Sequence, residues 1–174
     1  MNIVMLGYRG TGKSVISKIL SKELKRKLFR VDDLITQTAG MPIPKYVEQE
    51  GWPAFRKLES EVVVRVSGEA HNSIIDCGGG VVLNGENMSL LKKQGKCVLL
   101  TASLDTIIDR IKKDRNRPAL EEGLNFEETQ KKILADRHEK YQSSADFICD
   151  TTTRKPGETA HEIIAYYKKK GWLK

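Results

Sequence analysis

A glycine-rich segment near the start of the chain, GYRGTGKS at residues 7–14, has the spacing G-x-x-x-x-G-K-[ST] of a phosphate-binding loop. It follows the apolar run IVML at residues 3–6 and precedes a stretch with helical periodicity. In that context, backbone N–H groups and the start of a helix attract phosphate. Lys13 would reach the β- and γ-phosphates of a nucleotide, and the Ser14 hydroxyl would ligate Mg²⁺. We therefore predict a nucleotide site formed by Gly10, Thr11, Gly12, Lys13, Ser14 and Val15.

A second segment, NSIIDCGGG at residues 72–80, combines two isoleucines, an aspartate and three glycines. The isoleucines are typical of a buried strand, and the glycines allow the backbone to approach another group closely. Asp76 would then lie at the carboxyl end of a strand, where ligands bind in open α/β sheets. An apolar strand that ends in aspartate is also the usual arrangement of a magnesium-binding carboxylate in nucleotide-binding proteins. The alternative is a strand that simply ends in a turn.

The composition favours a small anionic ligand. Lys and Arg number 30 against 23 Asp and Glu, which gives a formal charge of +7. The densest basic patch, KELKRK at residues 22–27, fits the solvated face of a helix, and aromatic residues are only 6%. Three scattered cysteines indicate reduced core thiols, and the start of the sequence resembles neither a signal peptide nor a membrane span. We expect a cytoplasmic protein that binds neither nucleic acid nor membrane.

The elements that must position these residues alternate between apolar runs and amphipathic segments. Strands are expected at residues 3–6, 28–31, 73–76, 97–100 and 147–150. Helices are expected at 13–27, at about 50–66, at 104–113 with Ser103 as N-cap, up to about Tyr141, and from Pro156 onward. Residues 115–125 have no periodicity and indicate a loop. This alternation predicts a three-layer α/β fold with a parallel sheet, and no linker divides residues 1–174.

Five segments occur together in an order and spacing similar to those of the shikimate kinase family: GYRGTGKS, AFRKLES at 54–60, DCGGG at 76–80, RNRPAL at 115–120 and DRHEKYQSSAD at 136–146. The resemblance implies a P-loop kinase with a five-stranded parallel sheet of order 2-3-1-4-5. It implies a single kinase domain over residues 1–174, with a substrate-binding region at about 32–60 and a mobile lid at about 112–124. Such a kinase uses ATP and Mg²⁺ to phosphorylate the 3-hydroxyl of shikimate, a step of aromatic amino-acid biosynthesis. We expect a monomer.

The resemblance also assigns roles on the substrate side. Asp32 would hold the shikimate hydroxyls and orient or deprotonate the one that attacks. Arg56 would pair with the substrate carboxylate, with Glu59 fixing it, and Arg137 would be the second arginine on that carboxylate. Arginine suits this task because its fork binds a carboxylate through two bonds, which lysine cannot do. Backbone would approach the substrate ring at Gly78, Gly79 and Gly80.

On the nucleotide side, the resemblance implies a lid arginine and two adenine contacts. Arg117 would close over the phosphates, and its loss would reduce the rate on the order of 10³-fold, by analogy with other phosphate-contacting arginines. Arg110 and Arg154 would pack against adenine. Without the family pattern, the arginines at 110–117 would be interpreted as part of an ordinary exposed loop.

One position departs from the family pattern. The family has D-x-D at the end of the second strand, where the first aspartate serves the magnesium water shell, but this chain has RVD with Arg30 in that place. Our hypothesis is that the metal-side carboxylate has moved to Asp76, on a neighbouring strand about 4.8 Å away. Asp76 would act with Ser14 on Mg²⁺. The competing hypothesis is a structural Arg30–Asp76 salt bridge in a nucleotide binder with impaired catalysis.

Two other functions remain open from the sequence. One is a related P-loop kinase for another small hydroxy acid such as gluconate. The other is a non-catalytic shikimate- or nucleotide-binding module acting in regulation. The charge reversal at Arg30 is the feature that supports this alternative.

Overall fold

The computed structural model describes residues 1–113 and 126–173. Its strands are β1 (Asn2–Gly7), β2 (Leu28–Arg30), β3 (Ile74–Asp76), β4 (Gly95–Thr101) and β5 (Phe147–Asp150). Its helices are α1 (Lys13–Leu24), α2 (Val31–Ala39), α3 (Ile43–Glu69), α4 (Gly85–Gln94), α5 (Leu104–Lys113), α6 (Phe126–Ser144) and α7 (Pro156–Lys169), with one 3₁₀ turn, η1 (Val81–Leu83).

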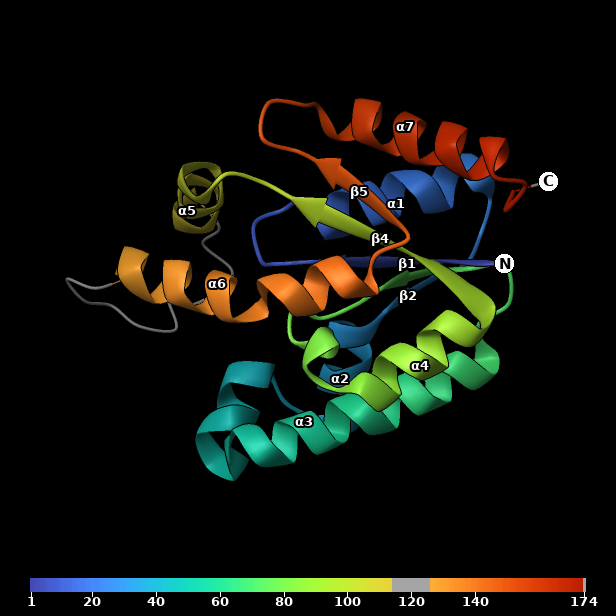
Figure 1. The fold of residues 1–174 in the computed structure, drawn as a ribbon. Helices are drawn as coiled ribbons and strands as arrows, with labels where there is room; N and C mark the ends of the chain where they lie inside the picture. Colours follow the sequence, from blue (N-terminus) through green and yellow to red (C-terminus); the bar gives the residue numbers. More distant parts are fainter. Residues whose placement is uncertain (114–125, 174) are drawn as a thin grey trace.

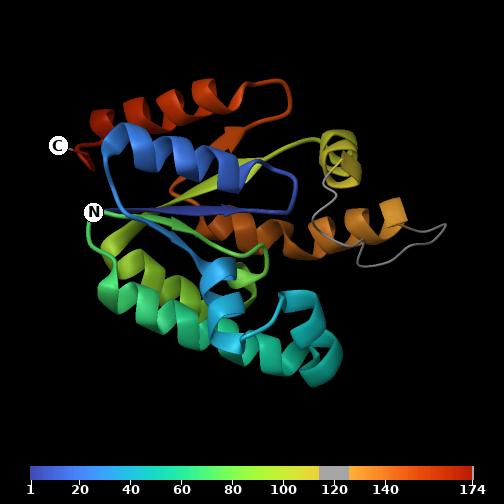
Figure 2. The same ribbon diagram turned by 180° about the vertical axis from the view of Figure 1, so that it is seen from behind.

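The five strands form a parallel sheet of order β2-β3-β1-β4-β5, which confirms the predicted order and the three-layer architecture. Helices α1 and α7 lie side by side on one face of the sheet (Figures 1 and 2). Helices α3 and α4 cover the opposite face, with α2 leading into α3. Long crossovers of this kind are the usual connections of a parallel sheet.

The central position of β1 in the sheet explains why its residues 3–6 are all apolar. Val4 and Leu6 point into the core under α3 and α4, whereas Ile3 and Met5 point into the core under α1 and α7. Successive side chains of a strand face opposite sides, so a strand covered on both faces needs apolar residues throughout.

Two helices were not predicted, and the bounds of others differ. The first is α2, which begins at Val31, a residue that was assigned to a strand. The second is α4, which begins after Asn84, whose side chain accepts hydrogen bonds from the Glu86 and Asn87 N–H groups. The first helix was expected to reach residue 27 but ends at Leu24. The reason is that the next residue, Lys25, adopts the left-handed conformation (φ 51°, ψ 42°) that commonly terminates helices.

The third helix starts earlier than expected and contains a kink. It runs from Ile43 to Glu69, and Gly51 interrupts it with φ 83° and ψ 167°, two residues before Pro53. Two predicted helix starts are confirmed. The Thr106 N–H donates to Ser103 Oγ at 3.3 Å, and Pro156 is the first residue of α7.

The carboxyl ends of the parallel strands meet at one edge of the sheet, so the loops after them can share a site. Arg30, at the end of β2, pairs in register with Asp76, at the end of β3.

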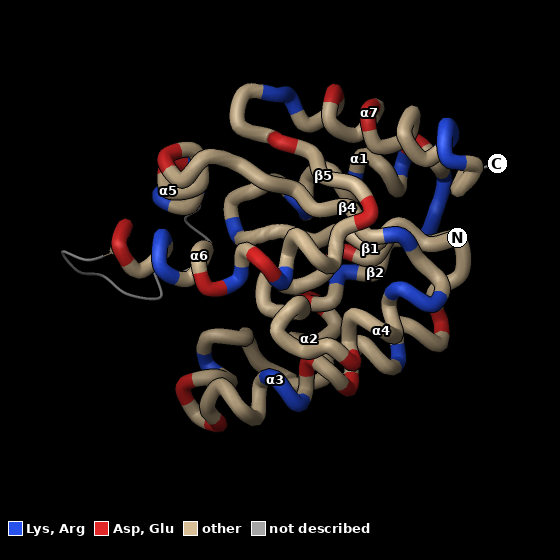
Figure 3. Tube along the Cα trace, in the orientation of Figure 1, with Lys and Arg blue, Asp and Glu red and all other residues tan. Residues whose placement is uncertain are grey.

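Lys and Arg are interspersed with Asp and Glu along α6 (Figure 3). Within residues 1–113 and 126–173, no helix is long and apolar enough to cross a membrane.

Candidate active site

The phosphate loop connects β1 to α1 at the centre of this edge. Gly12 adopts a left-handed conformation (φ 92°) directly before the first helical residue, Lys13, so the loop turns sharply into the helix. The Lys13 ammonium donates to the carbonyls of Gly7 at 2.8 Å and Tyr8 at 3.3 Å. Thr11 is buried, and its hydroxyl donates to the Tyr8 carbonyl at 2.7 Å. The predicted nucleotide residues therefore form a compact turn at a helix N-terminus, where phosphate binds favourably.

Two residues from the second half of the chain, Arg110 and Thr151, donate hydrogen bonds to carbonyls of this loop. Arg110 Nη1 donates to the Gly10 carbonyl at 3.1 Å, and its Nη2 donates to the Thr151 carbonyl at 2.6 Å. The Thr151 hydroxyl donates to the Thr11 carbonyl at 3.0 Å. Thr151 was not predicted, because nothing in the local sequence after β5 marks it as a loop contact.

Two other predicted nucleotide residues, Val15 and Arg154, take no part in these hydrogen bonds. Val15 is 53% exposed on the first turn of α1. Arg154 forms an ion pair with Glu162 of α7. Arg117 and nearly all of the predicted lid lie outside the described residues; Lys112 and Lys113 end α5.

Asp76 lies directly beside the phosphate loop. The Asp76 side chain is 6% exposed, and burial raises the pKa of its carboxyl group above the usual value, although the Lys13 charge and a hydrogen bond with the Ser14 side chain oppose this shift. Ser14 and Asp76, the two predicted metal residues, are therefore neighbours. Asp32 lies close enough for its charge to raise the pKa of Asp76 further.

Arg30 contacts two carboxylates. Its Nη1 lies 2.6 Å from Asp33 Oδ2, and its Nε lies 3.9 Å from Asp76 Oδ2. The predicted pairing with Asp76 is present, but the closer partner, Asp33, was not anticipated.

The predicted substrate residues gather around the three glycines after β3. A methyl carbon at Gly78 would lie 2.8 Å from Asp32 Oδ1 and 3.1 Å from Glu59 Oε1. A methyl carbon at Gly80 would lie 2.1 Å from Arg56 Nη1. Side chains of the site thus fill the space beside Gly78 and Gly80. Glycine at these positions leaves room for those side chains and also lets the backbone approach a ligand.

Arg56 and Glu59 form an ion pair on one face of α3, with 2.7 Å between Nη1 and Oε2. Glu59 is only 2% exposed, and burial raises its pKa, which the Arg56 charge partly offsets. Its other oxygen, Oε1, has no hydrogen-bond partner among the described residues. A buried carboxylate oxygen in this state can accept a hydrogen bond from a ligand. Arg56 also lies over the Phe55 ring, at 5.0 Å from its centroid.

Helix α6 adds two donors from the other side of the glycines. Arg137 Nη1 donates to the Gly79 carbonyl at 3.2 Å, and the Tyr141 hydroxyl donates to the same carbonyl. Burial raises the pKa of Tyr141 to about 12, so the phenol remains a donor at neutral pH. Tyr141 was not predicted, although it follows Arg137 by one helical turn, a spacing that places both on one face.

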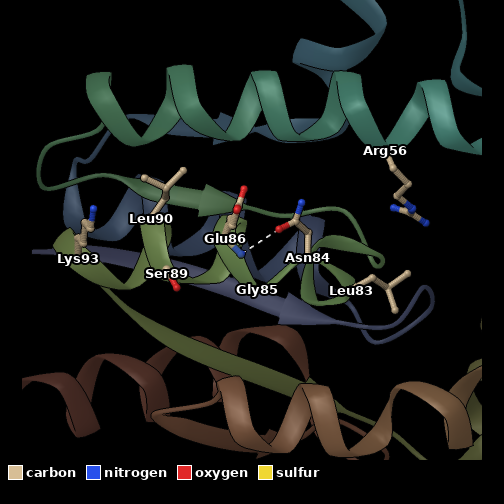
Figure 4. Close-up of a pocket in the computed structure, with 8 residues that line it drawn as sticks. All are labelled: Arg56, Leu83, Asn84, Gly85, Glu86, Ser89, Leu90 and Lys93. Carbon is tan, nitrogen blue, oxygen red and sulfur yellow. Dashed lines mark hydrogen bonds between the residues drawn. The ribbon is translucent and has the colours of Figure 1, made fainter.

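A pocket of about 1040 Å³ adjoins this cluster at Arg56 (Figure 4). Its other walls come from α4 and the preceding turn: Leu83, Asn84, Gly85, Glu86, Ser89, Leu90 and Lys93. Helix α4 leads back to the start of β4, so this pocket extends away from the phosphate loop. The site where two substrates could meet is therefore the region between the loop and the three glycines.

The donor set near Ser14 fits Mg²⁺ better than a tightly caged metal. Among residues 1–113 and 126–173, no three His, Cys, Asp or Glu side chains are grouped to hold a metal ion. Magnesium usually keeps several waters and binds through one or two carboxylates and substrate phosphates. One hydroxyl and one carboxylate beside a phosphate loop match that requirement.

Comparisons with known proteins cover nearly all of the chain. The family model for shikimate kinase matches residues 9–168. A shikimate kinase of Thermodesulfovibrio yellowstonii is 38% identical over 168 residues, covering 97% of this chain and 95% of the relative. One of Leptospira biflexa is 35% identical over 175 residues, covering 94% of each. The structure of a shikimate kinase from Acinetobacter baumannii in complex with shikimate superposes with a TM-score of 0.90 at 27% identity, covering 97% of this chain and 93% of that one.

Proposed function

Because this chain belongs to the shikimate kinase family, we propose that it transfers the γ-phosphate of ATP to the 3-hydroxyl of shikimate. The observation that carries this proposal is the cluster of Asp32, Arg56, Glu59 and Arg137 around the three glycines, next to the phosphate loop. The family assignment favours shikimate over gluconate or another hydroxy acid as the substrate, and it favours an enzyme over a regulatory binding module.

The charges of the cluster suit a substrate with one carboxylate and three hydroxyls. Arg56 and Arg137 would bind the carboxylate, since each guanidinium can give two parallel hydrogen bonds. Glu59 would fix Arg56, and its Oε1, which has no hydrogen-bond partner in the described part of the chain, would accept a hydrogen bond from a substrate hydroxyl. The negative charge of Asp32 raises the pKa of both Glu59 and Asp76, so Asp32 lies near both carboxyl groups. It would therefore reach the hydroxyl that faces the nucleotide.

Phosphoryl transfer requires positioning and charge neutralisation rather than a covalent intermediate. Asp32 would orient the attacking hydroxyl and accept its proton. Lys13 would leave the Gly7 and Tyr8 carbonyls to contact the β- and γ-phosphates. Arg117, which lies outside the described residues, would neutralise charge on the transferred group.

The nucleotide would lie on the loop formed by Gly10, Thr11, Gly12, Lys13, Ser14 and Val15. Arg110 would support this nucleotide site through its hydrogen bond to the Gly10 carbonyl. Arg154 would contact the adenine only after leaving its ion pair with Glu162. We further propose that the protein acts as a cytoplasmic monomer, in keeping with three buried cysteines that form no disulfide.

Ser14 and Asp76 would hold Mg²⁺, Asp76 through water. When bound, the ion neutralises charge on the β- and γ-phosphates. The hydrogen bond between Ser14 and Asp76 and the burial of Asp76 support this assignment. They also support relocation of the metal-side carboxylate from the position now occupied by Arg30.

The function is tested by measuring ADP release in a coupled assay with shikimate, with gluconate and without an acceptor. Turnover should depend on ATP and shikimate together. Turnover with gluconate but not shikimate would assign another substrate, and nucleotide binding without any acceptor-stimulated turnover would support the regulatory module.

The metal assignment is tested separately with Asp76→Asn, which keeps the shape of the side chain and removes its charge. We expect turnover to fall and the Mg²⁺ concentration for half-maximal rate to rise about tenfold or more. Unchanged turnover with an unchanged metal requirement would instead favour a structural Arg30–Asp76 pair.

A further inference from the structure

Arg30 joins a buried carboxylate to an exposed one. It is the last residue of β2, opposite Asp76 in the sheet register. Its Nη1 lies 2.6 Å from Asp33 Oδ2, and its Nε lies 3.9 Å from Asp76 Oδ2. The Nε atom is itself buried and has no hydrogen-bond partner within the described part of the chain. This donor thus lies 3.9 Å from the carboxylate that the proposed function assigns to the metal.

The two acids differ in surroundings. Asp33 has 57% of its side chain exposed, Arg30 has 31% exposed, and Asp76 has 6% exposed. An ion pair between partly exposed side chains three residues apart contributes little to stability, because solvent screens it. A buried carboxylate depends far more on nearby cations, and at Asp76 the charges of Lys13 and Arg30 act together. The contact with Asp76 is therefore the important one, and Asp33 fixes the outer end of the guanidinium.

We propose that Arg30 is a positioning residue that holds the carboxylate of Asp76 beside Ser14, and that Asp33 acts through Arg30 by anchoring its guanidinium. This inference rests on the proposed role of Asp76 at the metal. Groups that serve a metal ion are commonly held in one direction by a neighbouring side chain, and Arg30 would do this for Asp76.

Positioning and simple charge predict opposite results, which makes the proposal testable. Arg30, Asp33 and Asp76 together carry one net negative charge, since one cation offsets one of two carboxylates. If Arg30 acted only through its charge, replacing it with alanine would leave two negative charges and would strengthen Mg²⁺ binding. If Arg30 positions Asp76, the same substitution weakens Mg²⁺ binding.

The experiment is calorimetric titration of ADP into the full-length protein with Mg²⁺ and with a chelator. The ratio of the two affinities gives the Mg²⁺ enhancement, which does not depend on turnover. We expect Arg30→Ala to leave metal-free ADP affinity unchanged and to reduce the enhancement about tenfold. Arg30→Lys should resemble Arg30→Ala, because one ammonium cannot contact both acids. Asp33→Asn should reduce the enhancement less, and the Arg30→Ala/Asp33→Asn double variant should match Arg30→Ala.

Four results would overturn the proposal: a larger enhancement in Arg30→Ala, an unchanged enhancement with only a lower melting temperature, full retention in Arg30→Lys, or additive effects of the two substitutions. Asp33→Asn keeps the test decisive if Arg30→Ala does not fold, since Asp33 is on the surface. Asp76→Asn distinguishes a failure of the metal assignment from a failure of the positioning role. If it keeps the enhancement, the metal assignment itself fails; if it loses the enhancement and Arg30→Ala does not, only the positioning role fails.

Discussion

Replacing Gly80 with alanine displaces the Arg56 guanidinium without changing Arg56 itself, and so tests what its position contributes to substrate binding. The backbone at Gly80 has φ −99° and ψ −2°, which an alanine can adopt. The added methyl carbon would lie 2.1 Å from Arg56 Nη1 and 2.4 Å from its Cζ and Nη2. Because the guanidinium is the far end of a flexible side chain, Arg56 will move and the backbone will not.

The size of the effect follows from the required movement. Non-bonded carbon atoms approach to about 3.5 Å, so the guanidinium must retreat by roughly 1 Å or more. A displacement of this size removes the alignment of at least one charged hydrogen bond to the substrate carboxylate, worth about 1.5–3 kcal/mol. We therefore expect the KM for shikimate to rise about 10- to 100-fold, with the KM for ATP nearly unchanged.

The assay is steady-state ADP release at varied shikimate and saturating ATP, with Gly68→Ala as the matched control. Gly68 lies on α3, like Arg56, and a methyl carbon there meets nothing within 4 Å. The control should keep the parent KM and gain stability of about 0.5–1 kcal/mol. Arg56→Ala should raise the KM strongly, and adding Gly80→Ala to it should change little more.

An unchanged KM for shikimate in Gly80→Ala would refute the idea that Arg56 binds the substrate from its observed position. So would equal increases in the KM values of shikimate and ATP, which would indicate general disruption of the strand end. Additive effects of the two substitutions would mean that Gly80 acts independently of Arg56.

Three further substitutions test other parts of the site. Arg137→Lys keeps the charge but loses the fork, so the KM for shikimate should rise about tenfold; an unchanged KM would remove Arg137 from the carboxylate site. Burial raises the pKa of Glu59 above 4.5, so the stability associated with its protonated form is lost as pH rises through that raised pKa. The free energy of unfolding of Glu59→Gln, measured in urea relative to the parent, should therefore increase from about pH 4 to about pH 7, and a decrease would contradict the burial effect. Tyr141→Phe removes the hydroxyl that donates to the Gly79 carbonyl and should lower the unfolding free energy by about 1 kcal/mol; no change in urea unfolding would show that this bond contributes nothing net.

Patterns confined to one segment were readable from the sequence. The phosphate loop combines a spacing motif with a strand before it and a helix after it, and β3 is marked by two isoleucines followed by glycines. The neighbouring positions of Ser14 and Asp76 followed from the expected strand order, because strand ends in a parallel sheet share one edge.

Other features were missed, each for a different reason. Helix α2 follows β2 without a break, so the apolar residue Val31 was read as part of the strand. Helix α4 did carry a signal, since Asn84 precedes it as an N-cap and Met88 and Leu91 are spaced for burial. The bond from Thr151 to the phosphate loop joins residues 140 positions apart, and sequence spacing alone cannot predict it.

The central place of β1 has a consequence for how the chain is made. Ile3 pairs with Ile74 on one side and with Lys96 on the other, so β1 is synthesised long before either neighbouring strand. Pairings of such high sequence separation form slowly, and an apolar strand without partners is prone to aggregate in the meantime. Thr151 and Arg110 complete the support of the phosphate loop from still later positions. The loop that marks this protein most clearly in its sequence is thus synthesised well before the residues that complete its surroundings.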